Sequence, residues 1–122
     1  MNLPHQKPLV FAKNIINKNE QAATVLCDFS QTPTLAMFIE ASAQASSAFD
    51  TNESDEPKIG FLTTVRNIEL LDEIQNSIFL ITVIKENEIN NIKQFSFEAF
   101  DKDSNIKVVI GSFTIVVPDD NL

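Results

Sequence analysis

The sequence predicts an α+β fold in which an antiparallel sheet curls around one long central helix. Only the stretch from Thr32 to Phe49 has the pattern of a long helix, while six other segments show the alternation or the β-branched content typical of strands. The helical stretch contains a single ionisable residue, Glu40, so it lacks the charged face of an ordinary surface helix. A sheet that covers most of the helix satisfies both observations.

The first two strands are expected to form a hairpin. An apolar run begins at Pro8 and extends to Ile16, and the polar residues 17–20 follow as a turn. From Ala22 to Phe29 the residues alternate with strand period, and apolar residues occur on both faces. This second strand is therefore expected to be covered partly on each side.

The helix is expected to begin at Thr32. Threonine is a suitable N-cap, and Pro33 suits the first helical position because its missing N–H would have no acceptor within the helix. After the helix, residues 50–57 form an acidic polar segment, which is expected to be a solvated loop. This loop lacks the ligand spacing and the turn glycine of a calcium-binding loop, so no metal site is predicted there.

Four more strands are predicted in the second half of the chain. They span residues 59–70, 77–85, 92–101 and 106–117, and turns rich in Asn, Asp or Ser separate them near residues 86–91 and 102–105. The predicted order is therefore β-β-α-β-β-β-β, in a single domain over residues 1–122.

Composition and charge exclude several classes of function. The formal charge of −8 leaves no basic patch to neutralise phosphates, which argues against nucleic acid and anionic membrane surfaces as partners. The single cysteine, Cys27, cannot form an internal disulfide and is interpreted as a small buried strand residue. No signal-peptide pattern or long apolar run opens the sequence, so a cytoplasmic location is expected.

Four motifs, in order along nearly the whole chain, resemble a known family. They are Leu3-Pro4-His5 with Pro8-Leu9 shortly after it, the helical Ile39-Glu40-Ala41-Ser42-Ala43-Gln44-Ala45, the segment Gly60-Phe61-Leu62, and Val65-Arg66 beyond it. This pattern resembles the hot-dog-fold 3-hydroxyacyl acyl-carrier-protein dehydratases, and within them the ApeP-like branch associated with aryl-polyene-type pathways. The chain departs from the fatty-acid-cycle dehydratases at residues 29–33, where their Gly-His-Phe-Pro-Gly-type loop is replaced by Phe-Ser-Gln-Thr-Pro.

The resemblance implies two catalytic residues. Dehydration of a 3-hydroxyacyl thioester requires a base near the C2 proton, an acid for the departing C3 hydroxyl, and donors for the thioester oxygen. Family membership would make Glu40 the residue that acts on the C3 hydroxyl or on its water. It would make His5, the only histidine, the base, supplied across a dimer interface. The alternatives are a Glu40 that reaches solvent past small neighbours and a His5 that titrates as an ordinary residue near the terminus.

Other residues are expected to bind the substrate or to orient the catalytic carboxylate. The open amides at the helix start, around Leu35 and Ala36, are candidates to hold the thioester carbonyl oxygen. Gln44 lies one turn beyond Glu40 and is expected to fix its orientation.

An apolar acyl tunnel is expected to begin near Glu40 and to run along the helix. Gly60, Phe61 and Leu62 would line its start, because a glycine lets ligand or backbone approach closely. The ten phenylalanines, in a chain without Trp or Tyr, supply apolar surface for a core or a cavity. Phe38 and Phe79 are further tunnel candidates, but core packing is the favoured interpretation of each.

The leading function is dehydration of 3-hydroxyacyl thioesters in fatty-acid or polyene-type lipid synthesis, by a homodimer without cofactor or metal. A hot-dog thioesterase and a catalytically inactive acyl-binding or partner-binding dimer are the alternatives. The expected substrate is an acyl thioester of acyl carrier protein or coenzyme A. Since carrier proteins are acidic, docking would need a local cationic cluster drawn from Lys7, Lys13, Lys58, Arg66, Lys93 or Lys107.

Overall fold

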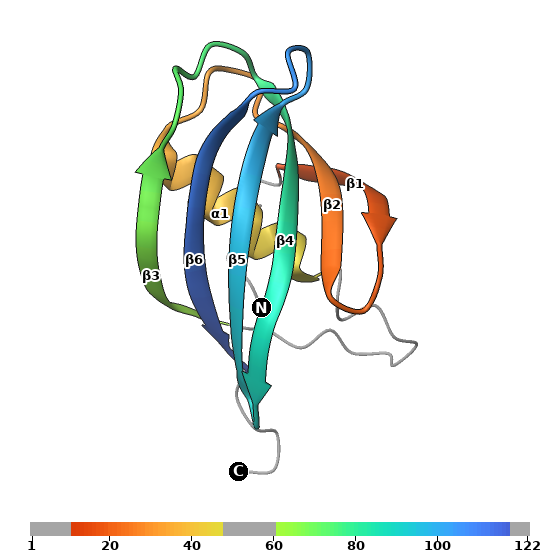
Figure 1. The fold of residues 1–122 in the computed structure, drawn as a ribbon, viewed down its shortest axis with the longest axis vertical. Coiled ribbons are helices and arrows are strands. Elements are labelled where there is room, and N and C mark those ends of the chain that lie inside the picture. The colour runs from red at the N-terminus through yellow and green to blue at the C-terminus, as the bar shows by residue number, and fades with distance from the viewer. Residues whose placement is uncertain (1–10, 48–60, 118–122) are drawn as a thin grey trace, which may run out of the picture.

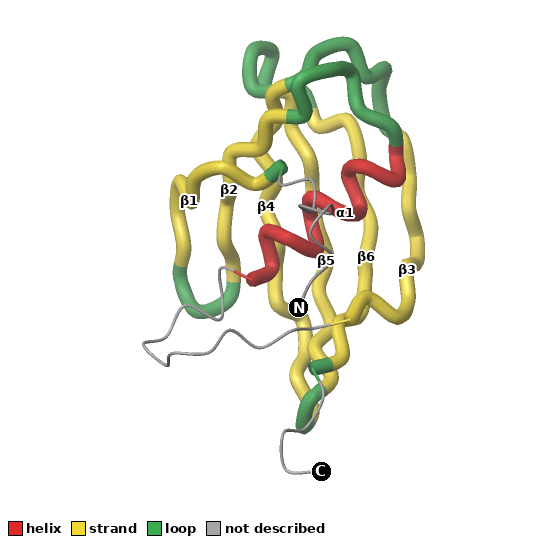
Figure 2. Tube along the Cα trace, turned by 180° about the vertical axis from the view of Figure 1, so that it is seen from behind, coloured by secondary structure: helices red, strands yellow, loops and turns green. Residues whose placement is uncertain are grey.

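A single helix lies across one face of a six-stranded antiparallel sheet (Figures 1 and 2). The structure, a computed structural model, describes residues 11–47 and 61–117. Its elements are β1 (Ala12–Lys18), β2 (Ala22–Asp28), α1 (Leu35–Ser46), β3 (Phe61–Leu70), β4 (Ile78–Ile89), β5 (Ile92–Asp101) and β6 (Lys107–Val116). The predicted order of two strands, a helix and four strands is confirmed.

The strands follow the spatial order β1-β2-β4-β5-β6-β3, and all neighbours are antiparallel. β2 pairs with β4, although α1 and β3 lie between these two strands in the sequence. β3 returns to pair with β6 on the far side of the sheet, which leaves β1 and β3 as the two edges (Figure 1).

The helix begins two residues later than the sequence predicted. Thr34, and not Thr32, is the N-cap: it has extended backbone angles, and its Oγ1 accepts a hydrogen bond of 3.2 Å from the Met37 N–H. Pro33 stands before the cap and is buried. Both threonines have a suitable side chain, but it is Thr34 that accepts the hydrogen bond from the first turn of the helix.

The expectation that the sheet covers most of the helix is wrong for the single chain. One side of α1 is buried, and it consists of Phe38, Ala41, Ser42, Ala45 and Ser46. Leu35, Ala36 and Glu40 are exposed on the other side. The small residues bring the helix close to the sheet, but a sheet that lies on one side of a helix can bury only that side (Figure 2).

The hairpin of β4 and β5 is longer and its turn tighter than predicted. The expected turn over residues 86–91 is instead mostly strand, because Glu88 pairs with Lys93 and Ile89 pairs with Ile92. Only Asn90 and Asn91 remain in the turn, and Asn90 takes a positive φ of 56°. Asparagine tolerates this left-handed conformation, which explains how so short a connection forms without glycine.

An aromatic cluster joins the helix to the sheet. The ring of Phe38 on α1 lies edge-on to Phe79 of β4, with centroids 4.9 Å apart, and to Phe29 at 5.2 Å. Phe38 and Phe79 have no exposed surface, so the interpretation of both as core residues is confirmed. Such edge-to-face pairs add to the free energy gained from apolar burial alone.

A backbone irregularity in β3 anchors that edge strand to the core. Asn67 has a positive φ of 56°, and the register with β6 shifts between Arg66 and Glu69. The half-buried Ile68 then packs over Gly111 of β6, where a Cβ atom would overlap Ile68 Cδ1. The missing side chain at Gly111 thus makes room for the contact that holds β3.

Cys27 is fully buried in β2, as expected of a structural residue. Burial raises the pKa of its thiol to about 12, so the thiolate is not formed near neutral pH.

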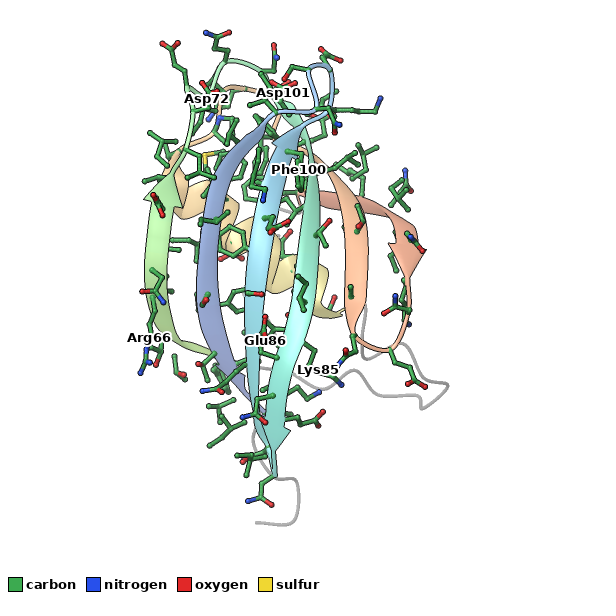
Figure 3. All side chains as sticks on the ribbon, viewed as in Figure 1. Arg66, Asp72, Lys85, Glu86, Phe100 and Asp101 are labelled. Carbon is green, nitrogen blue, oxygen red and sulfur yellow. The ribbon has the colours of Figure 1, made fainter. Side chains whose placement is uncertain are left out.

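Asp101 closes the turn between β5 and β6. Its carboxylate accepts hydrogen bonds from the Asn76 side chain (2.7 Å) and from the backbone N–H groups of Asp103 (2.8 Å) and Ser104 (3.2 Å). Burial acts to raise the pKa of the Asp101 carboxyl, but these bonds to the charged form outweigh it and hold the pKa below its usual value. The carboxylate thereby ties two loops together at one end of the sheet (Figure 3).

This network predicts a pH-dependent contribution to stability. A carboxyl whose pKa is lowered by folding stabilises the protein above its unfolded pKa of about 3.9 and loses that effect as the pH falls through the folded value. We expect Asp101→Asn to lower the free energy of unfolding by about 1–2 kcal/mol at pH 7 and by less at pH 3. Urea unfolding measures the free energy of unfolding at each pH, and Asp103→Asn, at an exposed residue, is the control. An equal loss of stability at the two pH values contradicts the lowered pKa of the Asp101 carboxyl.

Candidate functional site

A cleft of about 350 Å³ lies between the helix and one end of the sheet. Its walls are the C-terminal half of α1, the start of β3, the start of β5 and the end of β6. Its lining is mainly apolar on the sheet side and polar on the helix side. The lining residues are Glu40, Ala43, Gln44, Ser46, Ser47, Phe61, Leu62, Lys93, Phe95, Ile115 and Val117.

Glu40 is the only carboxylate among the described residues that line the cleft, and Lys93 is the only cation. Glu40 is exposed and projects from the outer side of α1, because it lies two residues from both the buried Phe38 and the buried Ser42. Its carboxylate therefore borders both the cleft and solvent. A carboxylate beside an apolar cavity is a group that can exchange a proton with a bound ligand.

Gln44 joins Glu40 to the start of the first strand. Its Nε2 donates to Glu40 Oε2 at 3.3 Å, and its Oε1 accepts from the backbone N–H of Phe11 at 2.8 Å. Since a backbone N–H can only donate, it determines which end of the Gln44 amide faces it and leaves the NH₂ group for Glu40. The expected orienting role of Gln44 thus has a geometric basis, one helical turn from the carboxylate.

The serines at the end of the helix turn their hydroxyls toward the backbone. Ser46 Oγ donates to the Ala43 carbonyl at 2.6 Å, and Ser47 Oγ donates to the Gln44 carbonyl at 2.7 Å. No histidine occurs within residues 11–47 or 61–117 to activate either hydroxyl. Within this described part of the chain, neither serine therefore has a histidine that could act as the base of a nucleophile.

The structure brings together four of the residues that the sequence indicated. Glu40, Gln44, Phe61 and Leu62 all line the cleft, on two elements far apart in the sequence. Phe61 is 56% exposed in the single chain, unlike the core phenylalanines.

The other four residues are not placed in the cleft. Leu35 and Ala36 are exposed at the start of the helix and are not among the lining residues, which come from the opposite half of α1. His5 and Gly60 lie outside the described residues, as does the acidic loop over residues 50–57. The roles predicted for Leu35, Ala36, His5 and Gly60 therefore stay predictions.

Sequence reasoning did not place Lys93 in the cleft, nor Phe95, Ile115 and Val117. The signal was present in the alternation of β5, where Phe95 and Phe97 are buried on the face toward the helix. Lys93 occupies the next position on that same face, and it is half-buried. Knowing which face is internal required the helix to be placed on the sheet.

No group of three or more His, Cys, Asp or Glu side chains is arranged to hold a metal ion within the described part of the chain. Over the same residues, α1 is too short to cross a membrane, and no other helix is present.

No family model matches the chain, and no curated protein sequence matches it. Solved structures do match. The dehydratase heterocomplex ApeI:P from Xenorhabdus doucetiae is similar with a TM-score of 0.73 and 20% identity, over 98% of this chain and 90% of that chain. A thioesterase from Haemophilus influenzae has a TM-score of 0.67 and 12% identity, over 86% of this chain and 77% of that one.

A third structure, a Streptococcus mutans protein bound to acetyl CoA, has a TM-score of 0.68 and 12% identity, over 93% of this chain and 96% of that one. Together these likenesses show the architecture: the chain has the hot-dog fold found in dehydratases and thioesterases. The predicted α+β hot-dog fold is confirmed.

The hydrogen bonds of Gln44 predict a measurable contribution to stability. Gln44→Met keeps the side-chain length but leaves the part-buried Phe11 N–H without its acceptor, so we expect a loss of about 1–2 kcal/mol in the free energy of unfolding. The matched control is Gln75→Met, which removes an exposed bond to Glu73 and should change stability by less than about 0.5 kcal/mol. Chemical denaturation measures the free energy of unfolding of both variants. Equal losses in the two contradict a specific contribution of the hydrogen bond between Gln44 and the Phe11 N–H.

Proposed function

We propose that this hot-dog protein binds acyl thioesters in the cleft beside Glu40 and dehydrates 3-hydroxyacyl groups. The observation that carries the proposal is a single carboxylate, oriented by Gln44, at the border of an otherwise largely apolar cleft on the central helix. The dehydratase heterocomplex, the thioesterase and the acetyl CoA complex with the same fold support a thioester as the ligand.

The cytoplasmic location and the single-domain assignment remain predictions from the sequence.

Each chemical requirement of dehydration has a candidate group. A base removes the C2 proton, the C3–O bond breaks as the double bond forms, and the departing oxygen takes up a proton to leave as water. Glu40 is the candidate acid for the C3 hydroxyl. His5 is the candidate base, supplied across a dimer interface, as the family resemblance implies.

The thioester oxygen needs hydrogen-bond donors as enolate character develops. The Met37 N–H donates a hydrogen bond to Thr34 Oγ1. The N–H groups of Leu35 and Ala36, which precede it, have no acceptor within residues 11–47 and 61–117. These two amides keep the predicted role. They lie at the start of α1, so a substrate that uses them would extend beyond the cleft toward that end of the helix.

Thioester hydrolysis is the second candidate activity. The exposure of Glu40 favours it, because a carboxylate that borders solvent can activate a water molecule for attack on the thioester carbon. Incubation of the protein with one 3-hydroxyacyl thioester separates the two: dehydration yields an enoyl thioester with the carrier retained, and hydrolysis yields a free thiol.

The role of Glu40 is tested by a near-isosteric change. Glu40→Gln keeps the size of the side chain but removes its titrating proton, so we expect turnover of a 3-hydroxyacyl thioester to fall by about 10²–10⁴-fold with the fold intact. Circular dichroism checks the fold, and Glu73→Gln, in an exposed loop, serves as the control with unchanged turnover.

His5→Ala is the companion variant. If His5 is the base, its loss costs a similar factor, and the double variant loses little more than either single one because the pair acts as a unit. A normal rate in His5→Ala contradicts the base assignment alone. Wild-type protein that binds an acyl thioester but neither dehydrates nor hydrolyses it contradicts both enzymatic proposals and supports the inactive binding protein.

The edge strand β3 is the candidate surface for a homodimer. It exposes Phe61, Val65 and Leu70, with Val65 38% exposed, and an unpaired strand edge invites a second strand. Register shifts occur in both edge strands, but the opposite edge, β1, carries two lysines, Lys13 and Lys18, and lysine on an edge strand discourages pairing. Because Phe61 also lines the cleft, a partner at β3 would complete the site.

We therefore expect Val65→Lys to weaken assembly by introducing a charge at the centre of the β3 edge. Ile16→Lys, at an exposed apolar residue of β1, is the control and should leave assembly unchanged. Sedimentation velocity at micromolar concentration measures both variants. A monomeric wild-type protein contradicts the homodimer and leaves a complex with a different protein as the alternative, by analogy with the dehydratase heterocomplex from Xenorhabdus doucetiae.

A further inference from the structure

The cleft beside Glu40 does not reach the start of the helix. Its lining residues on α1 lie between Glu40 and Ser47, and those on β5 and β6 come from the start of the one strand and the end of the other. Among the described residues, the first turn of α1 contributes none. The cleft is therefore confined to one end of the sheet, and the residues at its inner limit decide how long a ligand it can hold.

Two pairs of residues mark the limit between the cleft and the core. On β5, Phe95 lines the cleft, whereas Phe97, the next residue on the same face, is buried and does not. On β6, Ile115 lines the cleft, whereas Phe113, two positions earlier on the same face, is buried and does not. Phe95 and Phe113 are directly opposite each other in the two strands. The cleft therefore ends at this cross-strand pair.

Stacked aromatic rings close that end of the cleft. The rings of Phe95 and Phe113 lie with their centroids 5.3 Å apart and their planes at 23°. Phe113 also contacts Phe97, with centroids 6.1 Å apart. All three rings are buried, and a close-packed core has little space into which one of them could move. A ligand that extends past Phe95 has to displace this stack.

The helix wall of the cleft leaves room for a chain. Ala43 lies on the same side of α1 as Glu40 and Gln44, because residues three and four positions apart are neighbours on a helix. It is half-buried and lines the cleft with a methyl group alone. A larger side chain at this position would fill space that the acyl chain of a bound thioester can occupy. The cleft is thus open at Ala43 and closed at Phe95.

The volume of the cleft limits the length of that chain. At the roughly 30 Å³ that a water molecule occupies in the liquid, the cleft of about 350 Å³ holds about a dozen groups of that size. The thioester, the 3-hydroxyl group and the first atoms of the arm that bears the thioester take part of this space. The remainder accommodates a chain of about six carbons.

We infer that Phe95 restricts the protein to short acyl groups, of about six carbons or fewer, an inference that rests on the proposed function of the cleft. Phe95 determines specificity and takes no part in the chemistry. Its ring ends the space available to the chain, and the stack with Phe113 holds the ring in place. The expected substrate class is thereby narrowed from acyl thioesters in general to short-chain ones.

The test measures affinity against chain length. Amide analogues of acyl-pantetheine, in which an N–H group replaces the thioester sulfur, resist hydrolysis, and those with butyryl, hexanoyl, octanoyl and decanoyl groups are titrated by calorimetry into the wild-type protein. Each buried methylene group should raise the affinity about fourfold. We therefore expect a rise of about 15-fold from butyryl to hexanoyl, and no further rise at octanoyl or decanoyl.

Phe95→Leu shortens the end wall and keeps the core apolar. In this variant we expect the affinity to keep rising beyond hexanoyl, by at least about fourfold at octanoyl. The matched control is Phe29→Leu, which makes the same change at a buried ring of the core that does not line the cleft. This control should keep the wild-type limit at hexanoyl.

Ala43→Leu tests the opposite wall without touching the aromatic stack, and it decides the question should Phe95→Leu fail to fold. The larger side chain fills the cleft, so we expect the gain in affinity from butyryl to hexanoyl to disappear. Circular dichroism checks the fold of each variant.

Three outcomes overturn the inference. A wild-type affinity that keeps rising to decanoyl shows that the stack does not limit the chain, and an unchanged limit in a folded Phe95→Leu shows that another residue sets it. An unchanged gain from butyryl to hexanoyl in Ala43→Leu shows that the chain does not pass Ala43. In each case the analogues still bind, and the proposed thioester binding stands. Failure of the wild type to bind any analogue contradicts the proposed function itself, and the inference with it.

Discussion

The contact of one side of α1 with the sheet is the constraint on which the rest of the structure depends. Phe38 contributes the large ring, in edge-to-face contact with Phe79, and the small residues Ala41 and Ala45 let the helix backbone approach the strands. Burying this side fixes the rotation of the helix. Glu40 must then face away from the core, because it lies two positions from both Phe38 and Ser42, which is about 200° around the helix from each.

The path of β3 turns that exposed helix side into one wall of a cleft. The strand pairs with β6 at the far edge, held there by the contact of Ile68 with Gly111, and its first residues, Phe61 and Leu62, face the helix across the gap. Apolar surface on the sheet and a carboxylate on the helix are thereby placed on opposite sides of one cavity. This division suits a ligand with an apolar chain and a polar reacting group.

The sequence predicted the site in part, and the limit has a physical origin. Residue type singled out Glu40, because a lone carboxylate in an apolar helix is unusual, and helical spacing indicated Gln44; the resemblance implied a catalytic role for Glu40. The Phe11 N–H that orients Gln44 is 33 residues away in sequence, and Lys93 is farther still from Glu40. Local sequence patterns do not predict contacts between residues so far apart, because these contacts form only when distant strands pack against the helix.

The sequence by itself determined the element order, because periodicity and turn residues are local properties, and four of its motifs indicated the hot-dog fold by resemblance. Tertiary structure decided between Thr32 and Thr34 as the helix cap, since both residue types are suitable, and it extended β4 through pairing with β5. It also decided that Glu40 borders solvent and that Lys93 faces inward, because exposure depends on what the other elements cover.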